Sequence, residues 1–158
     1  AELATEVEII SLDKDFPSGE MNITTQGIGR VKIFEFQTVA AGKLYPSSAI
    51  ERLETTEEAS PDLQEEVYEL IDELHQLLGV EGKLPMTYEE LKSFEIGHHV
   101  GMNLHQEYSL LTLEGEEERL KAIKQHIQKI LPIVVEAERL KSRAKLNGHF
   151  KNLIPPHF

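Results

Sequence analysis

The sequence predicts an α+β fold in which an antiparallel sheet is followed by helices. Short runs of alternating apolar and polar residues fill about the first 55 positions, at hairpin-like spacing. From residue 60 onward the apolar residues follow the helical period. Strands first and helices second is typical of an α+β arrangement rather than a parallel α/β one. We expect a β-rich subdomain over residues 1–55 and a helical subdomain over 56–158.

The predicted sheet consists of short strands separated by turns. Val7 and Ile9 alternate with acidic residues in the first strand, and a turn over 13–20 follows, built on Pro17 and Gly19. The remaining predicted strands cover 20–27, 30–36 and 49–54, with a turn at 41–43 before the last one. Alternation is lost after Ile33, which predicts either a bulge or a strand buried on both faces.

The first helix is predicted from its end signals as well as its period. Ser60 is a good N-cap, Pro61 suits the first helical position, Asp62 suits the helix dipole and Gly79 supplies a C-terminal stop. One apolar stripe is expected to pack against the core: Leu63, Val67, Leu70, Ile71, Leu74, Leu77 and Leu78.

Three further helices are expected. The second begins near Thr87 and covers 88–99, and the third covers about 105–112. A long amphipathic helix covers about 116–147, and Pro132 within it is expected to kink or divide it. The tail from residue 149 is too rich in proline to continue a helix.

Composition limits the function classes. The chain has 158 residues, no cysteine and a net charge of −12, so disulfides, thiolate metal sites and nonspecific nucleic-acid binding by the whole domain are disfavoured. No apolar run approaches the roughly 20 residues that span a bilayer. We expect a cytoplasmic protein. The basic segment 139–151 is predicted to be a solvated helix face, with contact to a nucleic acid or an acidic partner as the alternative.

The stretch "HHVGMNLHQE", residues 98–107, raises the question of a metal site. His98 and His99 are adjacent and therefore diverge by about 100° on a helix, and a straight helix places His105 about 10 Å further along. A loop could still gather His99, His105 and Glu107. A small metal-dependent enzyme using His98, His99 and His105 is therefore an alternative hypothesis, and histidines at helix ends are the main interpretation. The apolar residues of the stretch are expected to pack the helical subdomain: Val100, Met102 and Leu104.

No catalytic motif is recognisable. The run "GVEGKL", 79–84, lacks the spacer and the hydroxyl residue of a phosphate loop, and no Gly-x-Ser-x-Gly elbow or Ser–Lys motif occurs. The sequence therefore predicts no catalytic, cofactor-binding or metal-binding residue, and no enzyme activity. The residues that bind substrate are not assigned.

Several segments, in their order, resemble the N-terminal, substrate-binding domain of Lon-type proteases. They are "TEVEIISLDKDFPSGEMNITTQGIGRVKIFEF", "KLYPSSAIERLE", "FEIGHHVGMNLHQEYSLLTLEGEEERLKAIKQHI" and "VEAERLKSRAK". The closest resemblance is to stand-alone bacterial Lon-domain proteins, also called peptidase S16-like, which lack the ATPase and protease domains.

This resemblance implies a PUA-like β subdomain followed by a helical one. It also implies a non-catalytic, proteolysis-related module that binds unfolded or exposed protein segments without a cofactor. RNA binding is a second alternative, because PUA-like folds bind RNA elsewhere. The binding surface is expected to be a groove between sheet and helices or an exposed apolar patch.

One departure from the family pattern carries its own expectation. The family's proline-rich first strand and the segment after it have no counterpart, and the chain begins inside a later strand. We therefore expect a fragment of a longer protein with an incomplete barrel. An unpaired sheet edge would then invite pairing with another chain, including self-association.

Overall fold

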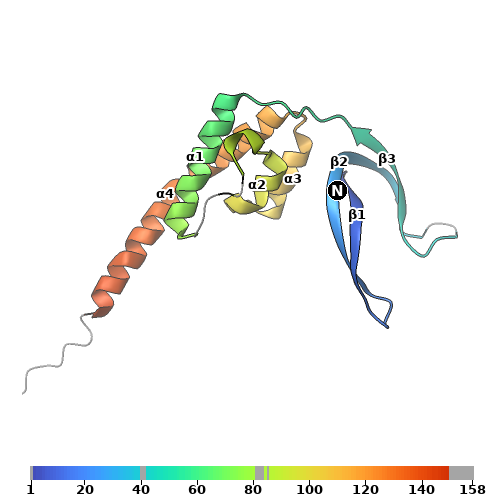
Figure 1. Ribbon diagram of the computed structural model, residues 1–158, viewed down its shortest axis with the longest axis horizontal. Helices are drawn as coiled ribbons and strands as arrows, with labels where there is room; N and C mark the ends of the chain where they lie inside the picture. The colour runs from blue at the N-terminus through green and yellow to red at the C-terminus, as the bar shows by residue number, and fades with distance from the viewer. Residues whose placement is uncertain (1, 40–41, 81–83, 85, 150–158) are drawn as a thin grey trace, which may run out of the picture.

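The computed structural model describes residues 2–39, 42–80, 84 and 86–149. It confirms the α+β fold: a three-stranded antiparallel sheet of order β1-β2-β3 precedes the helices, which lie beside it (Figure 1). The strands are β1 Leu3–Asp15, β2 Met21–Gln37 and β3 Ser47–Leu53. The helices are α1 Pro61–Leu78, η1 Tyr88–Glu90, α2 Ser93–Ile96, η2 Gly97–Val100, α3 Leu104–Thr112 and α4 Glu116–His149. The division into two subdomains and the PUA-like description stay predictions.

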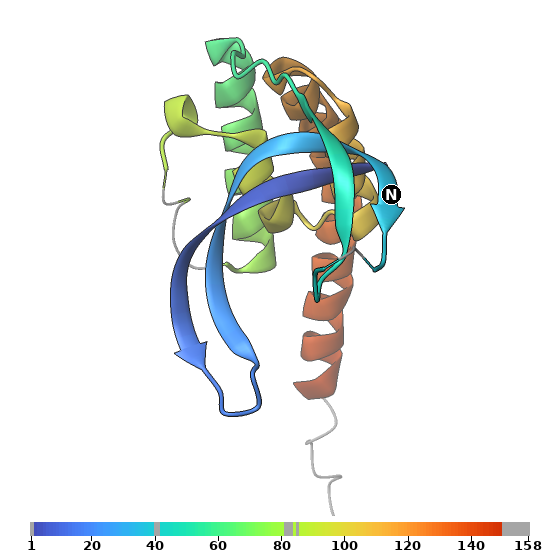
Figure 2. The same ribbon diagram turned by 90° about the vertical axis from the view of Figure 1, so that its right-hand side faces the viewer.

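The sheet has fewer and longer strands than the sequence pattern predicts. β2 is one continuous strand through Gly27 and Gly29, not two strands over 20–27 and 30–36. The turn predicted over 13–20 is shorter, because Asp13 accepts hydrogen bonds from Ser11 and from Thr24 on β2 and so holds β1 in the ladder. Figure 2 shows β1 and β2 curving together as one long hairpin.

The loss of alternation after Ile33 has the predicted cause. The pairing of β2 with β3 shifts register between Phe34 and Gln37, and Glu35 has a φ of 43°. This is a bulge, in which an extra residue interrupts the pairing. The other explanation, a strand buried on both faces, is wrong, because Phe36 is exposed.

Helix α1 confirms the predicted start and stop. The Ser60 hydroxyl accepts a hydrogen bond from the Leu63 amide, and Gly79 ends the helix with a φ of 68°. Four residues of the predicted stripe are fully buried: Leu63, Val67, Ile71 and Leu74. Leu78, the last residue of the predicted stripe, is exposed and does not pack against the core.

The predicted helix over 88–99 is wrong as a single element. Thr87 does begin it, through a capping box with Glu90, but the chain then breaks into η1, α2 and η2. The cause is tertiary. The Ser93 amide donates to the Glu116 carboxylate on α4 instead of to a carbonyl of its own helix. Lys92 is consequently extended.

The last two helices agree with the sequence in extent. α3 begins one residue earlier than predicted. α4 runs without interruption through Pro132, so the alternative that the proline divides the helix is wrong, and the kink at Pro132 stays a prediction. The buried core lies among the helices, and Val100 and Met102 pack in it as predicted. Leu104 does not, since 82% of it is exposed. The loop residues 81–83 and the tail 150–158 lie outside the described residues.

Candidate functional site

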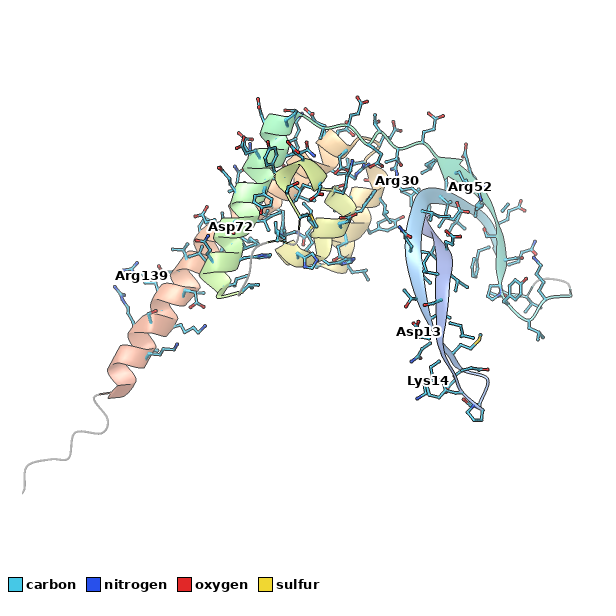
Figure 3. All side chains as sticks on the ribbon, viewed as in Figure 1. Asp13, Lys14, Arg30, Arg52, Asp72 and Arg139 are labelled. Atoms are coloured by element: carbon cyan, nitrogen blue, oxygen red, sulfur yellow. The ribbon has the colours of Figure 1, made fainter. Side chains whose placement is uncertain are left out.

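One arginine joins the sheet to the helices. Arg30 on β2 is only 3% exposed, and it lies where the sheet meets the helical half (Figure 3). Its Nη1 donates to the carbonyls of Leu111 and Leu113, at 2.7 and 2.8 Å. Its other donors bind the Glu54 carbonyl at 2.6 Å and the Thr55 hydroxyl at 2.9 Å. Arg30 therefore fixes β2 against both the chain after β3 and the end of α3.

Burial and three neighbouring charged residues act on the pKa of Arg30. Burial first, and then the positive charge of Arg119, lower the pKa of Arg30 below its usual range, while Glu114 and Glu57 oppose the change. An arginine nevertheless stays protonated in proteins. Its charge is matched by carbonyl dipoles, which leaves it few donors to offer a ligand.

A tyrosine makes the second joint. The Tyr108 hydroxyl on α3 accepts hydrogen bonds from the amides of Glu2 and Leu3, each at 3.2 Å. These amides belong to the start of β1, which is an edge strand. Tyr108 therefore supplies these two amides with the acceptor that a neighbouring strand would otherwise provide.

A groove of about 890 Å³ lies between the sheet and the helices that these joints hold together. Such a volume is within the range of ligand pockets in proteins. The sheet contributes the floor through β1, β2 and the end of β3, and α2 and α3 contribute the opposite wall. Its apolar and aromatic lining residues are Ile28, Leu53, Phe94, Leu104, Tyr108, Leu110 and Leu111.

The charged side chains in the groove are mostly paired with one another. Lys92 Nζ donates to the Glu57 carbonyl at 3.0 Å and lies 3.6 Å from its carboxylate. His98 Nδ1 is 2.8 Å from Glu107 Oε1. Glu95 also lines the groove and makes no ion pair among the residues that the structure describes. The groove is thus an apolar surface with an excess of acid.

The wall behind Phe94 is a buried polar cluster. Glu116 accepts from the Ser93 amide and hydroxyl, each at 2.6 Å, and pairs with Arg119 at 2.8 Å. The Arg119 guanidinium lies 4.5 Å from the centre of the Phe94 ring. Ser93 and Arg119 are both fully buried. A serine beside a carboxylate invites a catalytic interpretation, but no substrate can reach it, so the cluster positions α2 and Phe94.

The structure does not bring the candidate metal ligands together. His98 faces Glu107, whereas His99 contributes its carbonyl oxygen to a contact with His75 Nε2 at 3.1 Å. Within the described part of the chain no group of three possible ligands has the geometry to hold a metal ion. His98, His99 and His105 therefore remain separate, and the metal-dependent alternative is not favoured.

The histidine that does have a defined position was not singled out in the sequence. His126 on α4 is nearly buried, with Nε2 3.0 Å from the Val100 carbonyl and Nδ1 3.2 Å from Gln106 Nε2. Nε2 therefore carries the proton and donates, and Nδ1 accepts from Gln106. This histidine fixes η2 and α3 on α4, which places the groove wall.

Apolar surface extends beyond the groove along the sheet. Apart from Arg30 and Val31, the sheet has no fully buried side chain among the described residues. Ten large apolar side chains of the described strands are more than 40% exposed: Val7, Ile9, Ile10, Leu12, Met21, Ile23, Ile28, Phe34, Phe36 and Ile50. Contiguous apolar patches mark interaction surfaces, and these side chains are the residues of the sheet that are available to form one.

The sequence did not reveal the residues that build the site. Arg30 and Tyr108 stand in ordinary strand and helix patterns, and nothing in their neighbours predicts that they reach across the groove. Glycine within a strand often marks a place where another backbone approaches closely, but a Cβ on Gly27 would meet only the Thr5 side chain, at 3.3 Å, and one on Gly29 would meet nothing within 4 Å. Gly27 and Gly29 both line the groove.

Comparisons with known proteins found likeness in structure. No family model and no curated protein matches the chain. Among solved structures, the chain is similar to a Lon N-terminal domain protein from Xanthomonas campestris, with a TM-score of 0.49 and 17% sequence identity. The likeness covers 77% of this chain and 65% of that one, so the chain spans less than two thirds of its length. A likeness of this degree does not establish membership of that family.

A search of the described residues for membrane spans found none. No helix there is both long and apolar enough to cross a bilayer.

Proposed function

We propose that the chain is a non-catalytic module that binds unfolded or exposed segments of other proteins. The observation that carries the proposal is the groove between sheet and helices, which was one of the two binding surfaces expected from the sequence. Its walls are apolar, and the polar groups of Arg30, Lys92 and His98 are already engaged within the protein. A ligand of this groove gains mainly by burying apolar side chains.

The groove is better suited to peptides than to nucleic acids. Phosphate binding requires free basic side chains, and a net charge of −12 repels a polyanion. The acids Glu57, Glu95 and Glu107 line the groove itself. RNA binding is therefore not favoured. A cytoplasmic location and a role connected with bacterial proteolysis remain part of the proposal, as the sequence resemblance suggested.

Leu104 offers a direct test. It lines the groove, and it is the first residue of α3, where a negative charge is favourable to the helix. Leu104→Glu should therefore fold normally and still place a charge on the apolar wall. A matched control is Leu140→Glu on α4, which is 54% exposed and outside the groove.

The measurement is binding of a fluorescently labelled, permanently unfolded model protein, together with suppression of its aggregation. We expect the native chain and Leu140→Glu to bind alike, and Leu104→Glu to bind about tenfold more weakly, as the loss of one buried leucine implies. Absence of binding by the native chain, or equal weakening by both variants, would contradict the proposal.

A further inference from the structure

Within the described part of the chain, the outer edge of β1 is free over most of its length. In the sheet order β1-β2-β3, β1 pairs with β2 alone among these residues, and Tyr108 covers the edge at Glu2 and Leu3. A strand edge with unpaired amides and carbonyls is a template for another strand. The strand added to this edge could come from another protein or from a second copy of this chain.

The hydrogen-bonding direction of β1 identifies the outward-facing groups. The Glu2 carbonyl accepts from the Ile33 amide on β2, so this carbonyl turns toward the sheet, whereas the Glu2 amide, which precedes the strand, donates to Tyr108. Alternate residues of an antiparallel strand point their backbone groups to opposite sides. Leu3 accordingly donates outward, to Tyr108. The register shift between Glu6 and Val7 leaves out Ile28 on β2 and no residue of β1, so β1 keeps its alternation as far as Ile9. Thr5, Val7 and Ile9 therefore present their amides and carbonyls at the free edge.

The side chains of the same segment alternate in character. Thr5 lines the groove, and Val7 and Ile9 share its face and are 51% and 62% exposed. Glu6 and Glu8 lie on the other face, where Glu6 is already paired with Arg52 on β3 and Glu8 has no ion pair among the described residues. A strand added beside β1 would place its own residues directly opposite these, and opposite charges stabilise such cross-strand pairs. The complementary ligand therefore alternates apolar and basic residues.

Charge also decides between a second copy of this chain and a different partner. Residues 2–15 contain five carboxylates, Glu2, Glu6, Glu8, Asp13 and Asp15, against Lys14 alone. Pairing two copies of β1 would bring these acids together, and like charges directly opposite destabilise a sheet. The edge therefore disfavours its own copy.

We propose that β1 receives an extended, basic segment of another protein as a fourth strand, with its apolar side chains continuing the surface of the groove. This rests on the proposed function, since it specifies how a protein segment is held and which segments are preferred. Backbone hydrogen bonds supply affinity in this mode, and alternate side chains supply selectivity.

The experiment compares three peptides of one length. The first alternates valine and threonine with lysine, the second replaces each lysine by glutamate, and the third is the lysine peptide N-methylated on alternate backbone nitrogens. We expect the lysine peptide to bind at least about tenfold more tightly than the others and to protect the Thr5, Val7 and Ile9 amides from hydrogen exchange. Equal binding of the lysine and glutamate peptides, or protection confined to other elements, would overturn the proposal.

A charge-reversal pair isolates the edge from the charge of the whole chain. Glu8→Lys and Glu73→Lys change the net charge equally, and Glu73 lies on α1, away from the sheet. We expect Glu8→Lys to lower the affinity for the lysine peptide about fivefold, which is the effect of reversing one cross-strand charge pair. Glu73→Lys should change this affinity less than twofold. Equal effects of the two variants would show that only net charge acts.

Two outcomes separate this inference from the function on which it depends. If the unfolded model protein binds in a Leu104-dependent way while the β1 amides stay unprotected, the strand-addition mode is wrong and the groove proposal stands. If neither peptides nor unfolded protein bind, the proposed function itself fails. A sedimentation-detected dimer that protects the same three amides would assign the edge to a second copy instead.

Discussion

The helical half and the sheet of this protein are stabilised in different ways. Among the described residues, the helical half has an apolar core of eleven buried side chains contributed by α1, α2, η2, α3, α4 and the segment before α2. In the described part of the sheet, Val31 is the one buried apolar side chain. The hydrogen bonds between the sheet and the helices are concentrated at Arg30 and Tyr108. The difference indicates that the helices are a stable support, whereas the sheet is an exposed surface held on that support by a few polar contacts.

The largest expected difference between the halves comes from equal truncations of isoleucine. Ile71 on α1 is fully buried, and Ile9 on β1 is 62% exposed. Ile71→Ala should lower the free energy of unfolding by about 2–5 kcal/mol because it leaves a cavity, and Ile9→Ala by less than about 0.5 kcal/mol. Urea unfolding followed by circular dichroism measures both. A large loss for Ile9→Ala would mean that the sheet surface is buried in an assembly.

The joint between the halves should show an intermediate effect that is local. Arg30→Met removes hydrogen bonds from a charged group to three carbonyls and a hydroxyl, and bonds of this kind contribute about 1.5–3 kcal/mol each without adding fully. We expect the free energy of opening of the sheet amides, measured by hydrogen exchange, to fall by about 2 kcal/mol. Amides of α1 should keep their protection.

The control for the joint is Arg52→Met, which removes the same charge from an exposed position on β3. It should leave the contacts between the halves intact. If Arg30→Met lowered the protection of the sheet and of α1 equally, the two halves would unfold as one cooperative unit, and the contrast between them would be wrong.

The smallest expected effect is the acid sensitivity of the sheet. The hydrogen bond from Arg52 holds the pKa of Glu6 below its usual value, and bonds from Ser11 and Thr24 do the same for the pKa of Asp13. A carboxylate with a lowered folded-state pKa stabilises the fold above its unfolded pKa, about 4.3 for glutamate. That stabilisation is lost as the pH falls through the lower folded value.

We therefore expect the exchange protection of β1 and β3 amides to fall below about pH 4. Arg52→Gln should remove the contribution of Glu6 and make this part of the acid response smaller. An unchanged pH profile in Arg52→Gln would show that the surface ion pair contributes nothing to the sheet.

Local signals in the sequence were sufficient where the cause of structure was local. The cap, proline and glycine of α1 lie within a few positions of the helix that they delimit, and the loss of alternation after Ile33 marked the bulge. The same reasoning failed for 88–99, because a carboxylate 23 positions away, Glu116, takes the amide of Ser93. It failed for Leu104 because an apolar residue in a helical pattern can line an open groove as well as a core.

The sequence by itself determined the α+β class, the order of strands before helices and most helix ends, because these follow from periodicity and from contacts between near neighbours. Only the tertiary structure decided where the groove lies and which residues form it. Arg30 meets carbonyls more than 80 positions away, and Tyr108 meets amides more than 100 positions away. No local pattern encodes partners at such distances, since they are brought together only when the sheet packs beside the helices.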